Sequence, residues 1–330
     1  MAVANAVCAA EANPCKLAPI DQWATRANYR SPIVDGSING RPIRVLLDTG
    51  AAVSLIYGPV TSRLGLNPFP IKGGWISGIG GERRLLEVHI DEFRIADHAR
   101  KDWVAFVTAE RNLSTEVEFL LGYDFFHQMD VEFDLPSNVV RLHQAIDCES
   151  TSLAYWTSDA SALPLESHGR IEFTVSINGR PFTAWLDSGA STSLLSRSAA
   201  ALLGVTPDTT GVVSGGCVRG IGATRFDSWI GAFESFAVGN EIIHDARIAF
   251  TDLWRYSKVE VTGSHIPRAI ERLPDMLLGA DFLRSHRVLV AHSQSKMYFS
   301  YSGGPVFPVR AGRPCSATKN YGAPAASQTR

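Results

Sequence analysis

The chain has 330 residues, of which 45% are hydrophobic and 19% are charged, and its formal net charge is -2 at pH 7. This length is sufficient for two hydrophobic cores, so we expect two domains. The small net charge gives no electrostatic basis for binding nucleic acid, and no apolar run is long enough for membrane insertion. Composition therefore predicts a soluble protein whose partner must be inferred from a site.

The N-terminal segment, MAVANAVCAAEANPCK, is small and apolar, and it contains Ala-x-Ala patterns like those at the cleavage end of a secretory signal. It has no basic residue before Lys16 and no strong apolar centre, so the signal is incomplete. We interpret residues 1–15 as an N-terminal tail or a signal remnant. The predicted location is periplasmic or secreted, and a cytoplasmic location is the alternative.

The cysteines also bear on the location of the protein. None of the five has the CxxC spacing of a zinc or redox site: Cys8, Cys15, Cys148, Cys217 and Cys315. Cys15 and Cys148 flank the first predicted domain, and we hypothesise that they form a disulfide if the protein is exported. Free thiols in a reducing compartment are the alternative.

An internal repeat dominates the sequence. The segment SINGRPIRVLLDTGAAVSLIYGPVTSRLGL begins at Ser37 and recurs at Ser176 as SINGRPFTAWLDSGASTSLLSRSAAALLGV. In both copies, Asn-Gly lies between alternating apolar and polar residues, which predicts a β-hairpin. The outgoing strand, 43–47 or 182–186, ends at an aspartate. Each aspartate is therefore expected on a tight loop between two core strands.

Further elements recur after these loops. A short helix is expected in each copy, opened by Gly58-Pro59 or by Ser196 and closed by Gly65 or Gly204. A Leu-Leu-Gly segment at 120–122 is repeated at 277–279, and it is expected to pass close behind the aspartate loop. Asp124 and Asp281, which follow these segments, are expected to assist the start of a short helix.

The repeat and the strand patterns define the domain boundaries that we expect. Residues 16–148 form the first lobe, and residues 162–310 form the second. The intervening stretch, 149–161, is rich in Ser and Thr and is interpreted as a linker, whereas 311–330 is interpreted as a disordered tail. The second copy contains an insertion around 253–267, which is expected in a surface loop.

The order of these motifs resembles the retropepsin-like aspartic protease family in a single-chain tandem form, as in bacterial-type aspartyl proteases. The motifs are an Asp-Thr/Ser-Gly-Ala loop, a glycine-tipped hairpin and a Leu-Leu-Gly segment, and each occurs twice, within 31–142 and 170–301. The resemblance implies a mostly β fold of two homologous barrel lobes, retropepsin-like or pepsin-like, with short helices. The lobes are expected to be related by a pseudo-twofold axis within a monomer.

The chemistry of peptide hydrolysis agrees with this resemblance. Water attack on a peptide needs one group that accepts a proton from the water and another that donates one to the carbonyl. Two carboxyl groups about 3 Å apart share one proton and supply both functions. We therefore predict an aspartic endopeptidase with Asp48 and Asp187 as catalytic residues. The residues expected to support this dyad are Thr49, Gly50, Ser188 and Gly189.

The two glycine-rich segments are predicted to be flaps that open to admit an extended polypeptide substrate and then close over it. Their tips are Gly78, Ile79 and Gly80 in the first copy, and Gly220, Ile221 and Gly222 in the second. A dinucleotide fingerprint is excluded, because Arg83 and Arg225 stand where GxGxxG requires its third glycine.

No cofactor or metal is expected, because two carboxyl groups and water suffice, and the histidines show no paired ligand spacing. Ala51 and Ala190 occupy the position where pepsin-like enzymes often carry a hydroxyl that lowers the pKa of a carboxyl group. We therefore expect activity to peak at mildly acidic to neutral pH. The alternative function is a non-catalytic peptide-binding module that has retained the aspartic protease fold.

Overall fold

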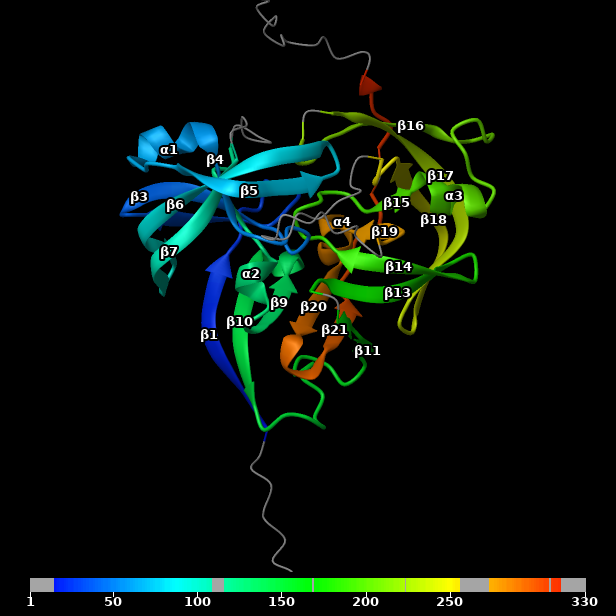
Figure 1. Cartoon of the computed structure of the whole chain (residues 1–330). Coiled ribbons are helices and arrows are strands. Elements are labelled where there is room, and N and C mark those ends of the chain that lie inside the picture. Colours follow the sequence, from blue (N-terminus) through cyan, green and yellow to red (C-terminus); the bar gives the residue numbers. More distant parts are fainter. Residues whose placement is uncertain are drawn as a thin grey trace, which may run out of the picture.

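The computed structural model describes residues 15–108, 116–167, 169–222, 224–255, 273–308 and 310–315. These residues form three sheets and only short helices. Two sheets make barrel-like lobes that stand side by side, and the third sheet lies below and between them (Figure 1). The predicted fold class, mostly β with two homologous lobes, is confirmed. No helix in the described ranges is long and apolar enough to cross a membrane.

The first lobe is a seven-stranded mixed sheet with the order β2-β3-β8-β4-β7-β6-β5, and pairing between β2 and β6 closes it. Helices α1 (Gly58–Leu64) and α2 (Tyr123–Phe126) follow β4 and β8. The strands are β2 (Ile33–Ile38), β3 (Arg41–Leu47), β4 (Leu55–Tyr57), β5 (Phe69–Gly78), β6 (Gly81–Ile95), β7 (His98–Thr108) and β8 (Phe119–Leu121).

The second lobe repeats this topology. Its order is β12-β13-β14-β19-β15-β18-β17-β16, with closure between β13 and β17, so that only β12 lacks a counterpart in the first lobe. Helices α3 (Arg197–Leu202) and α4 (Ala280–Leu283) follow β15 and β19. The strands are β12 (Glu166–Ser167), β13 (Ile171–Ile177), β14 (Arg180–Leu186), β15 (Leu194–Ser196), β16 (Val213–Val218), β17 (Phe226–Val238), β18 (Glu241–Thr251) and β19 (Met276–Leu278).

The third sheet combines strands from both halves of the chain in the order β1-β10-β9-β20-β21-β11. The central strands β9 and β20 pair antiparallel, with Phe133 opposite Val288. The strands are β1 (Lys16–Ala24), β9 (Asp130–Asp134), β10 (Val139–Ile146), β11 (Ser161–Pro164), β20 (His286–Ala291) and β21 (Lys296–Tyr301), and the 3-10 turns are η1 (Leu135–Ser137) and η2 (His292–Gln294). Hydrogen bonding in this sheet therefore joins the two halves directly.

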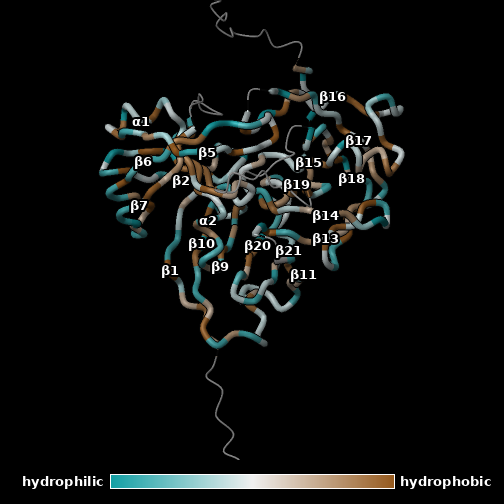
Figure 2. Tube along the Cα trace, viewed as in Figure 1, coloured by the Kyte–Doolittle hydropathy of each residue, from teal (hydrophilic) through white to brown (hydrophobic). Residues whose placement is uncertain are grey.

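Alternation along the strands explains how each barrel acquires its core. In β3, the side chains of Ile43, Val45 and Leu47 are buried, whereas the residues between them are partly exposed. All three residues of the short strand β8, which pairs with β3 on one side and β4 on the other, are buried. Hydrophobic segments accordingly gather on the inner strands, and hydrophilic segments lie in the outer loops (Figure 2).

The local turns and helix ends follow the sequence signals. Asn39 and Gly40 both have positive φ in the β2–β3 turn, as an Asn-Gly hairpin requires. Helix α1 has Pro59 in its first turn and ends at Gly65, whose φ is 68°. Helix α3 is capped by the Ser196 hydroxyl, which accepts a hydrogen bond from the backbone N–H of Ala199. The predicted surface insertion lies largely in 256–272, outside the described residues.

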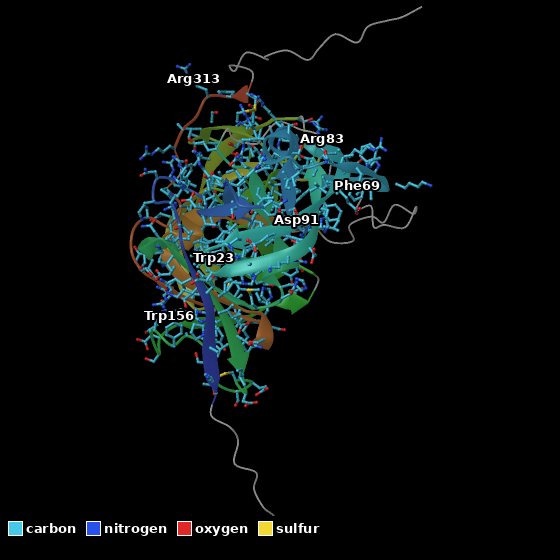
Figure 3. The ribbon with its side chains drawn as sticks, turned by 90° about the vertical axis from the view of Figure 1, so that its left-hand side faces the viewer. Trp23, Phe69, Arg83, Asp91, Trp156 and Arg313 are labelled. Carbon is cyan, nitrogen blue, oxygen red and sulfur yellow. A yellow bond between two sulfur atoms is a disulfide. The ribbon has the colours of Figure 1, made fainter. Side chains whose placement is uncertain are left out.

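Two disulfides cross-link the molecule, whose side chains are drawn in Figure 3. The bond between Cys15 and Cys148 joins the start of β1 to the segment after β10, and it confirms the hypothesised pair. The bond between Cys217 and Cys315, which was not predicted, ties the C-terminal segment to β16. Only the first residues of the expected C-terminal tail, 311–315, are described.

Candidate active site

Asp48 and Asp187 lie on equivalent loops of the two lobes. Each follows the outgoing strand of an Asn-Gly hairpin, β3 or β14, and precedes a short core strand, β4 or β15. The backbone N–H of Asp48 donates to the carbonyl of Leu121, and that of Asp187 donates to the carbonyl of Leu278, both at 2.9 Å. The Leu-Leu-Gly strands thus hold both loops in place.

The Leu-Leu-Gly glycines allow this close approach. A methyl group at Gly122 would lie 2.7 Å from the carbonyl carbon of Val53, and one at Gly279 would lie 2.8 Å from the carbonyl oxygen of Ala190. No side chain larger than hydrogen fits at these distances. The expectation that these segments pass close behind the aspartate loops is therefore confirmed.

The two aspartate loops meet between the lobes. A Cβ at Gly50 would lie 2.4 Å from Cγ of Asp187, and a Cβ at Gly189 would lie 2.3 Å from Cγ of Asp48. Each carboxyl group therefore packs against the glycine of the opposite loop, and the two carboxyl groups lie close enough for the charge of Asp187 to raise the pKa of Asp48. Two residues separated by 139 positions in the sequence are thus brought into contact.

The hydroxyl groups of Thr49 and Ser188 cross between the loops. The Thr49 hydroxyl donates to the carbonyl of Leu186 at 2.7 Å and accepts from the backbone N–H of Ser188 at 3.0 Å. The Ser188 hydroxyl donates to the carbonyl of Leu47 at 2.7 Å and accepts from the N–H of Thr49 at 3.0 Å. Both side chains are buried. This reciprocal pattern holds the two loops at a fixed separation.

The electrostatics of the pair favour a shared proton. Burial raises the pKa of both aspartates, and the neighbouring Asp187 charge raises the pKa of Asp48 further. Backbone N–H groups of Gly50 and Ala51 donate to Asp48 Oδ1 at 3.0 and 3.1 Å, and Ala190 N–H donates to Asp187 Oδ1 at 2.9 Å. These donors oppose the rise but do not cancel it. The arrangement can therefore provide one neutral and one ionised carboxyl group at the same time.

Two serine–aspartate pairs brace the loops from behind, and the sequence analysis did not assign them. Ser54 Oγ donates to Asp124 Oδ1 at 2.7 Å, and Ser193 Oγ donates to Asp281 Oδ1 at 2.6 Å. The same hydroxyl groups accept from the N–H of the Leu-Leu-Gly glycines. The recurrence of both members in the two copies is the sequence signal that could have revealed the pairs. Asp124 and Asp281 thus tie α2 and α4 to the aspartate loops, besides standing in the first turn of those helices.

The glycine-rich segments form hairpin tips that meet above the aspartates. The backbone N–H of Gly80 donates to the carbonyl of Ile221 at 2.7 Å, and Gly80 forms a parallel bridge with Gly222. A Cβ at Gly78 would lie 2.9 Å from Cβ of Ile221, and one at Gly220 would lie 2.9 Å from Cβ of Ile79. The two tips therefore pack backbone against backbone, and glycine at these positions permits the contact.

A cleft of about 970 Å³ lies between the aspartates and the hairpin tips. Both lobes line it, and Asp48, Asp187 and most of the predicted tip residues are among its walls. Trp75, which is 46% exposed on β5, also faces it. The hydroxyl of Tyr57 is buried in its wall and has no hydrogen-bond partner among the described residues. Sequence reasoning did not single out Tyr57.

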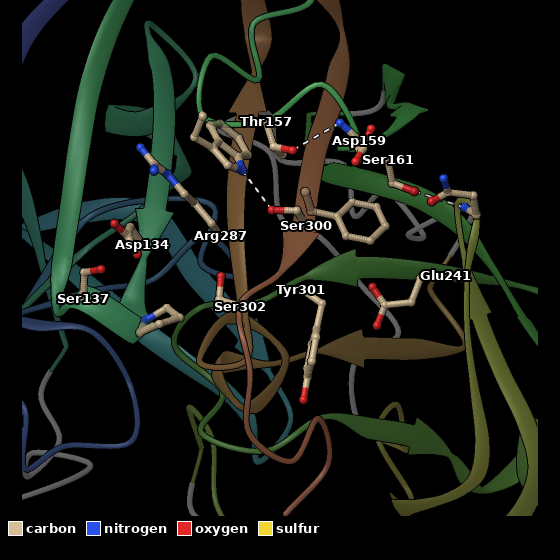
Figure 4. Close-up of a pocket in the computed structure, with 14 residues that line it drawn as sticks. Asp134, Ser137, Thr157, Asp159, Ser161, Glu241, Arg287, Ser300, Tyr301 and Ser302 are labelled. Atoms are coloured by element: carbon tan, nitrogen blue, oxygen red, sulfur yellow. Dashed lines mark hydrogen bonds between the residues drawn. The ribbon is translucent and has the colours of Figure 1, made fainter.

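A second hollow, of about 680 Å³, lies away from the aspartates on the third sheet (Figure 4). Three of the charged residues that line it form ion pairs within the protein. Asp134 binds Arg141, Glu241 binds His286, and Arg287 binds the buried Glu132. We therefore interpret these groups as structural, and the Arg287–Glu132 pair links the two halves of the chain. In the described part of the chain, no three His, Cys, Asp or Glu side chains gather as metal ligands would.

Comparison with known proteins places the chain in a family. The family model described as aspartyl protease matches two segments, 34–125 and 173–282, which together make up more than half of the chain. The chain belongs to the aspartyl protease family. Each matched segment contains one Asp-Thr/Ser-Gly loop, one glycine-tipped hairpin and one Leu-Leu-Gly strand. The predicted family resemblance, in tandem form, is therefore confirmed.

One curated protein is similar in sequence to part of this aspartyl protease chain. DNA damage-inducible protein 1 of Kluyveromyces lactis is 29% identical over 107 residues, which is 32% of this chain. The match covers 24% of that protein, so the chain spans about a quarter of the length of the relative.

Proposed function

We propose that this protein is an aspartic endopeptidase that hydrolyses peptide bonds with water activated between Asp48 and Asp187. The observation that carries the proposal is the contact of the two partly buried carboxyl groups, each packed against the glycine of the opposite loop. Family membership supports the same reaction class. Thr49, Gly50, Ser188 and Gly189 act as supporting residues, because they set the separation of the two loops.

The proposed reaction needs both protonation states of the pair. The ionised carboxylate accepts a proton from water as the water oxygen attacks the peptide carbonyl carbon, and the neutral carboxyl donates its proton to the carbonyl oxygen. Transfer of a proton to the amide nitrogen then allows the C–N bond to break. Burial raises the pKa of both aspartates, so the pair can hold one proton, and either aspartate can then serve as the acid while the other activates water.

We further propose that the two glycine-tipped hairpins are flaps, and that an extended polypeptide lies beneath them. The hydrogen bond between Gly80 and Ile221 must open for a peptide to enter from above. Because one chain supplies both aspartates, the active species is proposed to be a monomer. The two disulfides support an oxidising location outside the cytoplasm, either periplasmic or secreted.

Cleavage of a peptide library, followed by mass spectrometry across a range of pH, tests this proposal. We expect the wild-type protein to cleave, and we expect Asp48→Asn and Asp187→Asn each to lose at least about a hundredfold in kcat/KM, because a general acid–base contributes about 10²–10⁴-fold. Asp245→Asn is the matched control, because Asp245 is exposed and has a positive φ of 53° that asparagine also adopts.

The outcomes separate the two candidate functions. Activity that remains in both site variants would show that the dyad is misassigned. Peptide binding without cleavage at any pH would instead support the non-catalytic peptide-binding module. Loss of activity in the site variants, with normal folding and an active Asp245→Asn control, supports the endopeptidase.

A further inference from the structure

The two walls of the cleft differ, although the lobes that form them are repeats. Strand register identifies the equivalent positions. Leu55 pairs with Phe106 in the first lobe, and its counterpart Leu194 pairs with Ala249 in the second. Phe106 pairs in turn with Glu87, whereas Ala249 pairs with Ile230. All four of these partners line the cleft.

The same register relates Tyr57 to Ser196. Tyr57 pairs with Thr108, and Ser196 pairs with Thr251 at the equivalent row of the second lobe. The Ser196 hydroxyl already accepts a hydrogen bond from the N–H of Ala199 at the start of α3. Tyr57 occupies the same position before α1 but makes no side-chain cap. Its hydroxyl is instead left in the cleft wall.

The Tyr57 hydroxyl is an exception to the rule that buried polar groups are paired. The side chain is only 2% exposed, and the hydroxyl has no hydrogen-bond partner in the described part of the chain. A buried hydroxyl without a partner costs free energy, so such a group in a site indicates that a ligand or a water completes its hydrogen bonding. Tyr57 and Asp48 line the same cleft, and burial together with the Asp48 carboxylate raises the pKa of the Tyr57 hydroxyl.

Glu87 adds a charged acceptor to the same wall. It is partly buried in β6 and forms no ion pair with any described residue. The first-lobe wall thus combines a carboxylate, a hydroxyl and the ring of Phe106. The second-lobe wall presents Ala249 and Ile230 at the matching positions, so these two positions are apolar and one of them carries a much smaller side chain.

An extended peptide directs successive side chains to opposite sides, so residues on the two sides of the scissile bond meet different walls. We propose that the cleft is asymmetric in its specificity. Its first-lobe side selects a slender side chain that donates hydrogen bonds, such as Lys or Gln, and its second-lobe side selects a bulky apolar side chain. This inference rests on the proposed endopeptidase function and names the substrate class for it.

Cleavage-site profiling of a peptide library tests the asymmetry. We expect the wild-type protein to favour Lys or Gln on one side of the scissile bond and Phe or Leu on the other. Glu87→Ile converts a first-lobe position to its second-lobe counterpart, and it should reduce the Lys and Gln preference about tenfold or more without altering the apolar side, since one pocket contact changes discrimination by about 10–200-fold. Glu234→Gln is the control, because Glu234 is exposed on β17 and lies outside the cleft.

Two further variants test the separate parts of the proposal. Tyr57→Phe should weaken the same polar preference and leave the melting temperature unchanged or higher, because the hydroxyl that is removed has no described partner. Phe106→Ala should admit bulky apolar side chains on the first-lobe side. Ala249→Phe should exclude them from the second-lobe side, and its melting curve shows whether it folds.

Binding of the same library to Asp187→Asn separates this inference from the proposed function. If the wild-type protein cleaves no peptide, the endopeptidase proposal fails. The peptides that bind to Asp187→Asn still report the preferences of the two walls. Equal preferences on both sides of the scissile bond, or a profile that Glu87→Ile and Phe106→Ala leave unchanged, would overturn the asymmetry while leaving the endopeptidase in place.

Discussion

At the scale of single residues, the alanines that follow the two Asp-Thr/Ser-Gly triplets have no side-chain hydroxyl that could donate to the aspartates. Ala51 and Ala190 contribute only backbone N–H donors to the aspartates. Burial therefore dominates and raises the pKa of both carboxyl groups. Since the singly protonated pair is the proposed active form, we expect the activity profile of the wild type to lie at mildly acidic to neutral pH.

Ala190→Ser should move the acid limb of this profile. A serine hydroxyl at this position can donate to Asp187, which stabilises the ionised form and lowers its pKa. We expect the acid limb of kcat/KM to shift to lower pH by about one unit, since a charge-stabilising donor changes a pKa by this order. Profiles measured with one peptide across the pH range test this. Ser191→Ala, another cleft residue, is the control, and coincident acid limbs in all three proteins would contradict the prediction.

Asp281 gives a prediction for stability instead of activity. Burial raises its pKa to about 6, although Ser193 donates to it from both its hydroxyl and its backbone N–H. Because the folded-state pKa lies above the ordinary value, the stabilising contribution is fully present below about pH 4 and is lost as pH rises through about 6. The wild-type protein should therefore lose part of its free energy of unfolding between these values.

Asp281→Asn removes this titration. Urea unfolding at pH 4 and pH 7 should show a smaller difference between the two conditions for the variant than for the wild type, by at most about 3 kcal/mol. The variant should also be less stable overall, because asparagine cannot accept all the hydrogen bonds that the carboxylate accepts. An equal pH dependence in variant and wild type would show that Asp281 does not titrate in this range.

At the scale of elements, the two aspartate loops behave as one unit because each hydroxyl satisfies the backbone of the other loop. Thr49→Val removes two buried hydrogen bonds and should cost about 1–3 kcal/mol of unfolding free energy. Ser188→Ala should have a similar effect, and the double variant should cost less than both together, because loss of either hydroxyl loosens the loop contact on which the hydrogen bonds of the other depend. Thr174→Val on β13, an exposed position, is the control. Strict additivity would mean that the loops are independent.

The elements that the sequence predicted well are those repeated in both copies. The hairpins, the helix ends and the glycine contacts rest on local backbone requirements, so a short motif was sufficient to predict them. The third sheet was not predicted, because alternating strands such as β9 and β20 do not indicate their partners across long separations. The role of Tyr57 was also missed. The repeat aligns Tyr57 with Ser196, but only the folded structure shows that the Tyr57 hydroxyl is buried in the cleft wall without a partner among the described residues.

At the scale of the whole molecule, two cross-links close long loops in the chain. Cys15 and Cys148 are separated by 133 residues, and Cys217 and Cys315 by 98. Loss of one such bond typically costs about 2–5 kcal/mol. A reductant should therefore lower the melting temperature, and Cys217→Ser/Cys315→Ser should lower it without a reductant.

A thiol titration of the unfolded, unreduced chain checks the pairing directly. We expect one free thiol per chain of the printed sequence, which would be Cys8, because the other four cysteines are paired. Cys8 itself lies outside the described residues. A count of five would show that neither bond forms in the purified protein, and an unchanged melting temperature after reduction would show that the bonds do not stabilise the fold.

The antiparallel pairing of β9 with β20 has a consequence for behaviour at high dilution. A catalytic pair assembled from two separate chains is lost when the subunits dissociate, so its activity per chain falls as protein concentration falls. Here the strands that bring the halves together belong to one polypeptide, and their association is intramolecular. Specific activity should therefore stay constant upon dilution into the nanomolar range, which would allow the protein to work where no second copy is within reach.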